Sequence, residues 1–262
     1  AWRGLHLDVV RHFFPAERIR EAIDWCAAHK LNRFHWHLTD DQGWRLPVPS
    51  RPRLTEIGAW RTGAAGARHG GSYTSQEIRD LVRHAESRHV VIVPEVEMPG
   101  HARAAIAAYP DLSCAGAPLP VPSAWGVFED VFCAGNDEVF RFLEEVLTET
   151  AALFPGPWLH VGGDEVPKQR WLACPRCAAR RERERLAGGE ELQSWFIDRA
   201  ARIVRGLGRT LVGWDEILEG GAPADSVVMS WRGFDGGIAA ARAGLGAVMC
   251  PVAHCYLDSY QG

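Results

Sequence analysis

Two adjacent acidic residues, Asp164 and Glu165, follow a pair of glycines at the end of a short apolar run. Glycines at this point let the backbone lie close to a bound molecule. Neighbouring carboxylates resist ionising together, so we expect one of them to keep its proton nearer neutral pH, which suits a general acid beside an anionic stabiliser. The alternative is a helix N-terminus, where acidic residues are common. The similar pair Asp215-Glu216 lacks the glycines and fits that alternative better.

Three histidines and an aspartate form a second group of candidate site residues. His35 and His37 flank Trp36 within a predicted strand, and their side chains therefore share a face. Such a pair could bind a metal, but packed and hydrogen-bonded imidazoles are the favoured interpretation. Asp40 follows at the strand end and could fix the tautomer of an imidazole. His101, at the next strand end, is its expected partner.

Tryptophan is frequent in this chain, with eleven residues. Pyranose rings present an apolar C–H face that stacks on indole. A single tryptophan is more often part of a core, but several beside carboxylates and an arginine indicate a sugar site. Those at or near predicted strand ends or in loops are Trp44, Trp195, Trp214 and Trp231.

The seven cysteines are odd in number and unevenly spaced, so they do not indicate a disulfide framework. Cys174 and Cys177 have half the spacing of a zinc site, but no second pair of ligands stands at a matching distance along the chain. Ordinary surface thiols are therefore the favoured interpretation. Cys114 and Cys133 bracket a proline-rich loop and could pair in an oxidising compartment.

The composition excludes several classes of protein. The chain has 262 residues, of which 47% are hydrophobic and 24% charged, with a formal net charge of −4. This length fits one large α/β barrel or two ordinary domains. Without a basic block, a mildly acidic chain is not expected to bind nucleic acid. No apolar run approaches the roughly 18–20 residues of a membrane helix, so we expect no membrane insertion.

Short apolar strand patterns alternate with longer amphipathic stretches along the chain, which is typical of repeated βα units. The predicted strands cover 5–9, 32–38, 90–96, 158–161, 210–213, 226–230 and 247–250. Helices are predicted over 15–29, from Thr74 or Ser75 onward, and over 136–154, 190–207 and 233–243, while 58–71 is expected to be a glycine-rich loop.

Seven such strands, with polar residues after successive strand ends, predict an α/β fold of the (β/α)8 TIM barrel type that stops after its seventh strand. A doubly wound sheet is disfavoured, because no Gly-x-Gly-x-x-Gly follows the first strand. We expect residues 1–262 to form one catalytic barrel domain.

The ordered motifs resemble those of glycoside hydrolase family 20, the β-N-acetylhexosaminidases. The resemblance runs nearly end to end and is carried by residues 8–13, 35–44, 94–101, 160–165, 213–216 and 256–258. It implies that Glu165 is the general acid/base and Asp164 the carboxylate that orients the acetamido group. Tyr256 would hydrogen-bond the acetamido oxygen.

Six further residues would shape the pocket around the sugar. The indoles of Trp195 and Trp214 would wall the acetamido pocket. Arg11 and Asp258 would hold sugar hydroxyls. Asp40 and His101 would support the acid/base. The sequence departs from the family pattern at Glu97, where an aspartate is frequent, and it lacks the family's eighth strand and its small α/β domain ahead of the barrel.

The resemblance implies a retaining exo-glycosidase that removes terminal, non-reducing β-linked N-acetylglucosamine or N-acetylgalactosamine. The substrate would be an amino-sugar glycoside or oligosaccharide, and its own acetamido oxygen would be the nucleophile, so neither a metal nor an organic cofactor is expected. One alternative is a metal-dependent, isomerase-like sugar barrel that uses His37, Glu95, Asp164 and Asp215. The other is a carbohydrate-binding barrel without catalytic activity.

Overall fold

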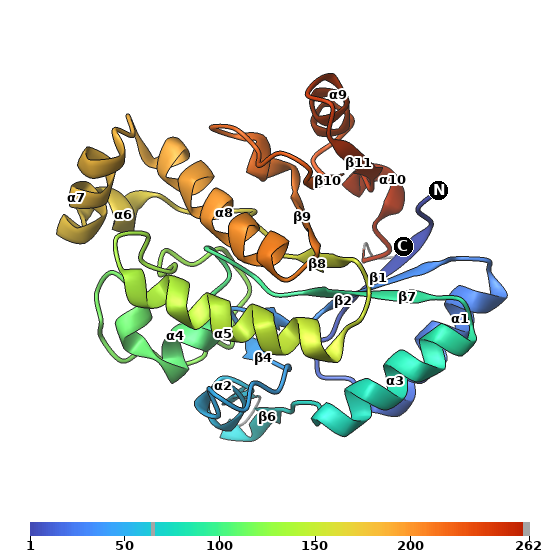
Figure 1. Cartoon of the computed structure of the whole chain (residues 1–262). Coiled ribbons are helices and arrows are strands. Elements are labelled where there is room, and N and C mark those ends of the chain that lie inside the picture. Colours follow the sequence, from blue (N-terminus) through green and yellow to red (C-terminus); the bar gives the residue numbers. More distant parts are fainter. Residues whose placement is uncertain (64–65, 259–262) are drawn as a thin grey trace.

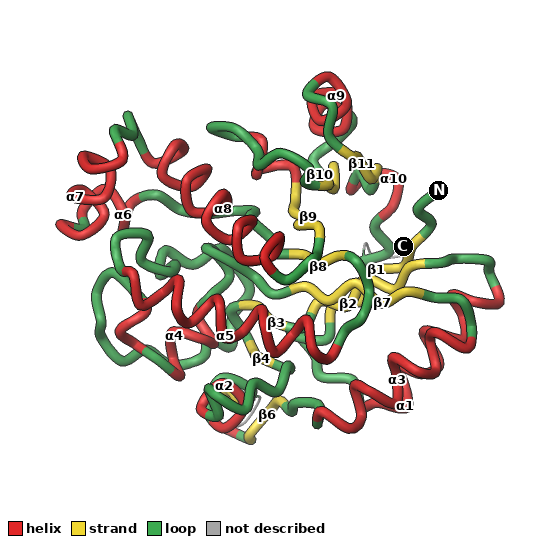
Figure 2. The backbone as a smooth tube through the Cα atoms, viewed as in Figure 1, coloured by secondary structure: helices red, strands yellow, loops and turns green. Residues whose placement is uncertain are grey.

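A sheet of seven parallel strands forms the centre of the molecule (Figure 1, Figure 2). The computed structural model describes residues 1–63 and 66–258. In hydrogen-bonding order, the strands are β1 (Gly4–Asp8), β2 (Arg33–His37), β7 (Val91–Glu95), β8 (Trp158–His160), β9 (Thr210–Trp214), β10 (Val227–Ser230) and β11 (Gly246–Met249). Strand order follows chain order and every pairing is parallel. The predicted succession of βα units is therefore confirmed.

Long helices connect the strands and pack outside the sheet, with α1 beside α3 and α5 beside α8 (Figure 1). They are α1 (Ala16–Ala28), α3 (Ser75–Ser87), α5 (Asp137–Leu153), α8 (Gly189–Gly206) and α9 (Asp235–Arg242). Ile19, Ile23 and Cys26 are buried at helical spacing in α1, as the sequence predicts. In α3, the Thr74 hydroxyl accepts a hydrogen bond from the Glu77 N–H, and the Glu77 carboxylate accepts one from the Thr74 N–H. This capping box fixes the predicted start of the helix.

The connection after β2 contains short elements that the sequence pattern did not indicate. They are the antiparallel pair β3 (Thr39–Asp40) and β4 (Gly43–Trp44), helix α2 (Arg53–Glu56), and a second pair, β5 (Trp60–Thr62) and β6 (Arg68–Gly70). The prediction of a loop over 58–71 is therefore wrong in part. Gly70 has a φ of +141°, and a side chain there would overlap the carbonyl of Ala59, so the glycine permits these strands to approach closely.

Further short helices lie in the later connections. They are α4 (Arg103–Ala108), the 3₁₀ helix η2 (Pro110–Leu112), α6 (Gln169–Ala173), α7 (Pro175–Glu184), the 3₁₀ helix η3 (Asp215–Leu218) and α10 (Val252–Cys255). In a βα barrel, the segments that follow the strands gather at one end and carry the active site. The two outer strands, β1 and β11, are not paired with each other in the described part of the chain. No helix within residues 1–63 and 66–258 has both the length and the hydropathy needed to cross a bilayer.

Candidate active site

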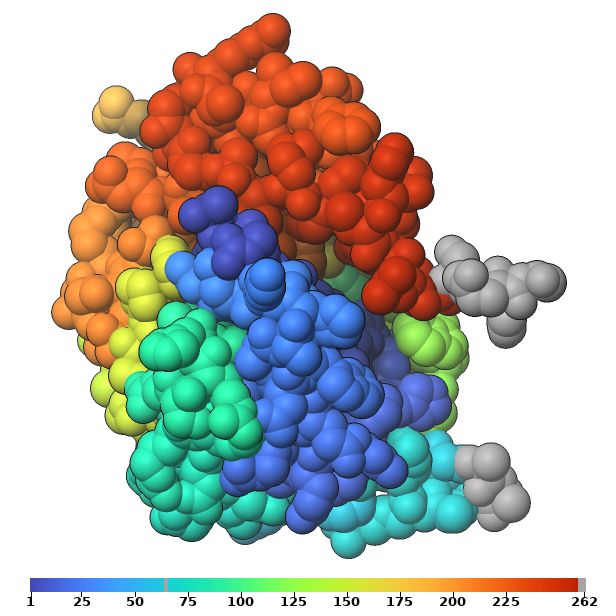
Figure 3. Space-filling model, turned by 90° about the vertical axis from the view of Figure 1, so that its right-hand side faces the viewer, coloured from blue at the N-terminus to red at the C-terminus, as the bar shows by residue number. Residues whose placement is uncertain are grey.

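A cavity of about 520 Å³ lies between β1 and the C-terminal segment and extends to the loops that follow the strands. Figure 3 faces this side of the molecule, where the N-terminal residues (blue) lie close to the C-terminal ones (red). Eight of the nine site residues predicted from the sequence line this cavity. They are Arg11, Asp40, His101, Asp164, Glu165, Trp214, Tyr256 and Asp258.

The turn after β8 carries the acidic pair into this cavity. Gly162 and Gly163 have φ values of +65° and +93°, in the left-handed region that favours glycine. A side chain at Gly162 would overlap the Glu97 carboxylate, and one at Gly163 would lie 2.7 Å from Ile217 Cγ2. Asp164 and Glu165 do not begin a helix, since α6 starts at Gln169, so the helix-terminus alternative does not apply to them.

The second acidic pair lies at a helix N-terminus, as the sequence analysis favours. Asp215 and Glu216 form the first turn of η3. The Arg232 Nε donates a hydrogen bond to Asp215 Oδ1 at 2.8 Å. Asp215 is therefore held by β10 and its following loop. In the described chain, His37, Glu95, Asp164 and Asp215 do not come together as one ligand set, which does not support the metal site of the isomerase-like alternative.

His101 connects the acidic pair to two aspartates behind it. Its Nδ1 lies 3.2 Å from Asp40 Oδ1 and 3.0 Å from Asp41 Oδ2. Its Nε2 lies 3.5 Å from Asp164 Oδ2 and 3.4 Å from Glu165 Oε2. Burial lowers the pKa of His101, but the charges of Asp40 and Asp164 outweigh it and hold that pKa well above the ordinary value. A charged imidazole thus bridges the two pairs of carboxylates, and Asp41 is a partner that the sequence analysis did not single out.

The pKa values of two carboxyl groups beside the cavity, Glu165 and Glu97, are shifted in opposite directions. The hydrogen bond from His101 lowers the pKa of Glu165 below its ordinary value, although partial burial opposes this. The structure therefore favours the ionised form of Glu165. Burial instead raises the pKa of Glu97 well above its ordinary value, with Asp164 and Glu95 adding to the effect. Burial also raises the pKa of Glu216 to about 8.

Arg11 is held rigidly at the rim of the cavity. Its Nη1 lies 2.9 Å from Asp8 Oδ2 and its Nη2 lies 2.7 Å from Asp40 Oδ2. Its Nε donates a hydrogen bond to Gln42 Oε1 at 3.0 Å. A guanidinium fixed on three sides presents its remaining N–H groups in one direction, which suits a donor to sugar hydroxyls.

The histidines of β2 lie inside the sheet around a single buried carboxylate. His35 Nε2 and His160 Nδ1 are 3.0 Å and 2.9 Å from the oxygens of Glu95, and His6 Nε2 is 3.2 Å away. Burial opposes ionisation of Glu95, but the neighbouring imidazoles hold its pKa well below the ordinary value. His6 Nε2 is hydrogen-bonded to this carboxylate and His37 Nε2 to the Thr39 carbonyl, whereas neither ring nitrogen of His35 has a hydrogen-bond partner in the described part of the chain. The imidazoles are therefore packed as the sequence analysis favours, but His35 is not hydrogen-bonded.

Only one of the two tryptophans predicted to wall the acetamido pocket lines the cavity. Trp214 lines the cavity, but Trp195 does not. Trp195 lies on α8, outside the sheet, with its ring centre 5.3 Å from that of Phe140 in α5 and the Arg180 guanidinium 4.6 Å above it. Its assignment as a pocket wall is therefore wrong. Trp231, which directly follows β10, takes this place, and its position after a predicted strand was the available signal.

Trp231 is fixed by polar and aromatic contacts. Its indole N–H donates a hydrogen bond to Glu216 Oε2 at 2.9 Å. Its ring lies 6.5 Å from that of Tyr256, at an interplanar angle of 25°. Burial raises the pKa of the Tyr256 hydroxyl, which therefore remains a hydrogen-bond donor at neutral pH. Trp2 and Trp125 also line the cavity, so four indoles surround its carboxylates.

The comparisons with known proteins agree with this geometry. The family model of the glycosyl hydrolase family 20 catalytic domain matches residues 1–262. The chain is 50% identical over 262 residues to a beta-hexosaminidase of Porphyromonas gingivalis, covering all of this chain and 34% of that protein. It also resembles a crystal structure of the GH20 exo beta-N-acetylglucosaminidase of Vibrio harveyi in complex with N-acetylglucosamine. That similarity has a TM-score of 0.91 and 38% identity, over 99% of this chain and 42% of the other.

A third similarity is to the N-acetyl-beta-hexosaminidase of Streptomyces plicatus in complex with Thio-NAglucal, with a TM-score of 0.85 and 36% identity over 98% of this chain and 49% of that one. The chain spans between a third and a half of the length of these proteins. The likeness to these structures confirms the predicted TIM-barrel fold, with seven parallel strands in residues 1–63 and 66–258. On its residues, its fold and the full extent of the family match, this chain belongs to glycosyl hydrolase family 20, within the catalytic domain of that family.

Proposed function

We propose that this domain is the catalytic part of a retaining exo-glycosidase that removes terminal, non-reducing β-linked N-acetylglucosamine or N-acetylgalactosamine. The observation that carries the proposal is the contact of His101 with both Asp164 and Glu165 in a cavity walled by indoles. The relative from Vibrio harveyi is an exo beta-N-acetylglucosaminidase in complex with N-acetylglucosamine, which supports this class of substrate.

In the first step, the acetamido oxygen of the substrate attacks the anomeric carbon as the bond to the leaving oxygen breaks. Glu165 donates its proton to that oxygen, so an alcohol leaves and a bicyclic oxazolinium forms. Family 20 is an exception to the usual retaining scheme, in which the nucleophile is an enzyme carboxylate. The scheme therefore uses only side chains and the substrate's own acetamido group.

Asp164 and Tyr256 orient that nucleophile. The Asp164 carboxylate accepts a hydrogen bond from the acetamido N–H and stabilises the positive charge that develops on the ring. The Tyr256 hydroxyl donates a hydrogen bond to the acetamido oxygen and holds it in line with the anomeric carbon. Trp214 and Trp231 pack against the acetamido methyl and the sugar face. Arg11 and Asp258 bind the sugar hydroxyls.

In the second step, the Glu165 carboxylate accepts a proton from a water molecule as that water attacks the anomeric carbon. The oxazolinium opens, the acetamido group is restored, and the β configuration is retained. His101 stabilises the ionised Glu165 in this step, since its hydrogen bond favours the carboxylate. The Glu165 side chain is 39% exposed, so a sugar that fills the cavity excludes water from it. Because loss of water disfavours the carboxylate, this raises the pKa of Glu165, which can then hold the proton that it donates in the first step.

The test compares aryl glycosides that differ only at C2, with the full-length protein. We expect hydrolysis of 4-nitrophenyl N-acetyl-β-glucosaminide and almost no hydrolysis of 4-nitrophenyl β-glucoside, because the glucoside lacks the nucleophile. A thiazoline that mimics the bicyclic intermediate should inhibit far more strongly than N-acetylglucosamine. Comparable rates on the two glycosides would place the nucleophile on the enzyme. Binding of N-acetylglucosamine without hydrolysis of either glycoside would instead indicate a carbohydrate-binding barrel.

A further inference from the structure

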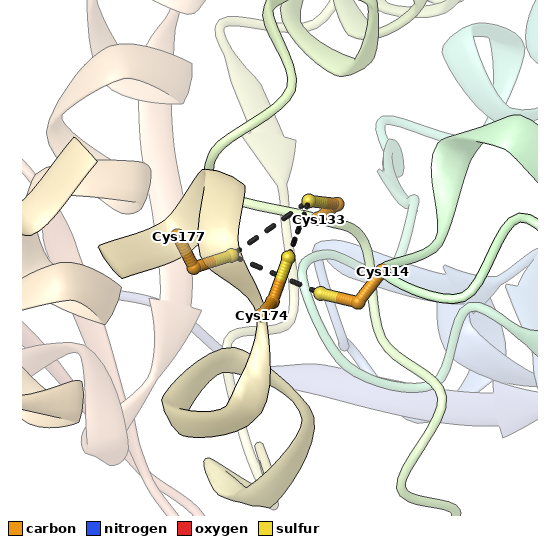
Figure 4. A group of neighbouring side chains, drawn as sticks. All are labelled: Cys114, Cys133, Cys174 and Cys177. Carbon is orange, nitrogen blue, oxygen red and sulfur yellow. Dashed lines mark hydrogen bonds between the residues drawn. The ribbon is translucent and has the colours of Figure 1, made fainter. Parts of the chain in front are cut away.

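Four cysteines from two separate connections meet in one cluster, Cys114, Cys133, Cys174 and Cys177 (Figure 4). The first two lie between η2 and α5, and the other two bracket the start of α7. Three of the four are buried. The interpretation of Cys174 and Cys177 as surface thiols is therefore wrong. The second pair of ligands, Cys114 and Cys133, stands 41 to 63 residues earlier in the chain, farther than the spacing of a local zinc motif.

The separations of the sulfur atoms match a tetrahedral metal centre. The Sγ atoms of Cys133 lie 3.9 Å from Cys174 and 3.7 Å from Cys177, and Cys114 lies 3.8 Å from Cys177. All four sulfurs are within 4.8 Å of one another. Four thiolates at about 2.3 Å from a central zinc ion stand about 3.8 Å apart. A disulfide requires about 2.05 Å, so these distances do not describe two disulfides.

The surroundings of the cluster suit a dianionic zinc tetrathiolate. The backbone N–H of Gly135 lies near the sulfurs of Cys133 and Cys177. A side chain at Gly135 would overlap the backbone of Arg176, so only glycine allows this approach. The Arg176 guanidinium donates a hydrogen bond to the Ser113 carbonyl at 2.9 Å, and its charge faces the sulfurs. Backbone donors and a nearby cation are the outer contacts that stabilise thiolate ligands.

We propose that Cys114, Cys133, Cys174 and Cys177 bind one zinc ion in a closed, structural site. Four protein ligands leave no open position for substrate or water, which distinguishes such a site from a catalytic zinc. The ion ties the connection after β7, which carries His101, to the connection after β8, which carries Glu165. The Trp171 indole N–H, hydrogen-bonded to the Phe132 carbonyl at 2.8 Å, joins the same two connections. The site therefore stabilises the loops that position the acid/base and its partner.

The first experiment measures metal in the full-length protein, purified with a reductant and without an affinity column that carries metal. Elemental analysis should find roughly one zinc ion per chain. Replacement of zinc by cobalt(II) should give the intense sulfur-to-cobalt charge-transfer band and the visible d–d bands of a tetrahedral thiolate site. Both readouts use the unaltered protein, so they do not depend on whether a variant folds.

The second experiment uses matched serine variants. Cys174→Ser together with Cys177→Ser should abolish zinc binding and lower the melting temperature. Cys255→Ser removes an exposed thiol outside the cluster and should keep the full zinc content. Metal-free protein with four alkylatable thiols at these positions would overturn the proposal. So would two disulfides among them in non-reducing mass spectrometry, or iron in place of zinc. None of these readouts depends on glycosidase activity, so they stand apart from the test of the proposed function.

Discussion

The Glu97 carboxylate occupies the space that a side chain at Gly162 would need. Glu97 follows β7 and Gly162 follows β8, so the two residues interlock neighbouring loops at the end of the sheet. Glu97 is fully buried and its pKa is raised well above the ordinary value, chiefly by burial. The turn that presents Asp164 and Glu165 is thus shaped by a buried carboxyl group of the adjacent loop.

Gly162→Ala should therefore destabilise the protein and remove most of its activity. Overpacking against Glu97 and a left-handed alanine together cost about 2–5 kcal/mol. Thermal melts and kcat/KM measure the two effects. Gly206→Ala is the matched control, because Gly206 ends α8 with no atom near its Cβ position and alanine favours a helix. A double variant with Glu97→Ala should recover part of the melting temperature. Equal melting temperatures for the two glycine variants would contradict this account.

Glu165→Gln and Asp164→Asn should differ in their dependence on the leaving group. Glu165→Gln removes the proton donor, so we expect a loss on the order of 10²–10⁴-fold for a disaccharide and little loss of intermediate formation with a dinitrophenyl group. Asp164→Asn misorients the acetamido nucleophile, so its loss should persist for good and poor leaving groups alike. The measurement is kcat/KM over aryl glycosides of graded leaving-group pKa. The reverse pattern would exchange the two roles.

His101→Asn should move the alkaline limb of the pH profile to higher pH. As a general acid, Glu165 is active only when protonated, so kcat/KM falls as the pH rises through its pKa. The hydrogen bond from His101 lowers that pKa. Without the imidazole the pKa rises, and activity persists to higher pH, although at a lower maximum rate. His84→Asn, which removes an imidazole paired with Asp24 on the helical surface, is the control. An unchanged limb would show that His101 does not set the protonation of Glu165.

Trp231→Ala should mainly impair catalysis, whereas Trp195→Ala should mainly lower stability. Trp231 lines the cavity, so its loss should raise KM and lower kcat with a small change in melting temperature. Trp195 packs between Phe140 and Arg180, so its loss should cost about 2 kcal/mol or more of stability and leave KM nearly unchanged. Kinetics with an aryl N-acetylglucosaminide and thermal melts compare the pair. A large change of KM in Trp195→Ala alone would restore its assignment to the pocket.

Much of this fold follows from local patterns in the sequence. Seven apolar strand segments and the helices between them are periodic enough to predict, and the glycines before Asp164 indicate the sharp turn that the structure contains. The short pair of β5 and β6 escaped prediction, because a glycine-rich stretch has no side-chain alternation.

The rest of the site depends on contacts between distant segments. Periodicity cannot tell which of two tryptophans faces a cavity, and the sequence therefore places Trp195 in the pocket wall where the structure has Trp231. The protonation of Glu97 and Glu165 depends on burial and on His101, which only the folded chain brings together.

His101 and Glu165 share a backbone feature with consequences for protein engineering, since their φ values are 47° and 46°. A left-handed conformation costs a non-glycine residue roughly 1–2 kcal/mol. Glycine at position 165 would relieve this strain, yet it would remove the side chain that performs proton transfer. At position 101 the loss of the imidazole would leave the buried carboxylates of Asp40 and Asp41 without their charged partner, which outweighs the relief of strain. Selection for thermostability and selection for turnover therefore oppose each other at position 165. A library screened for melting temperature alone would be expected to enrich inactive variants there.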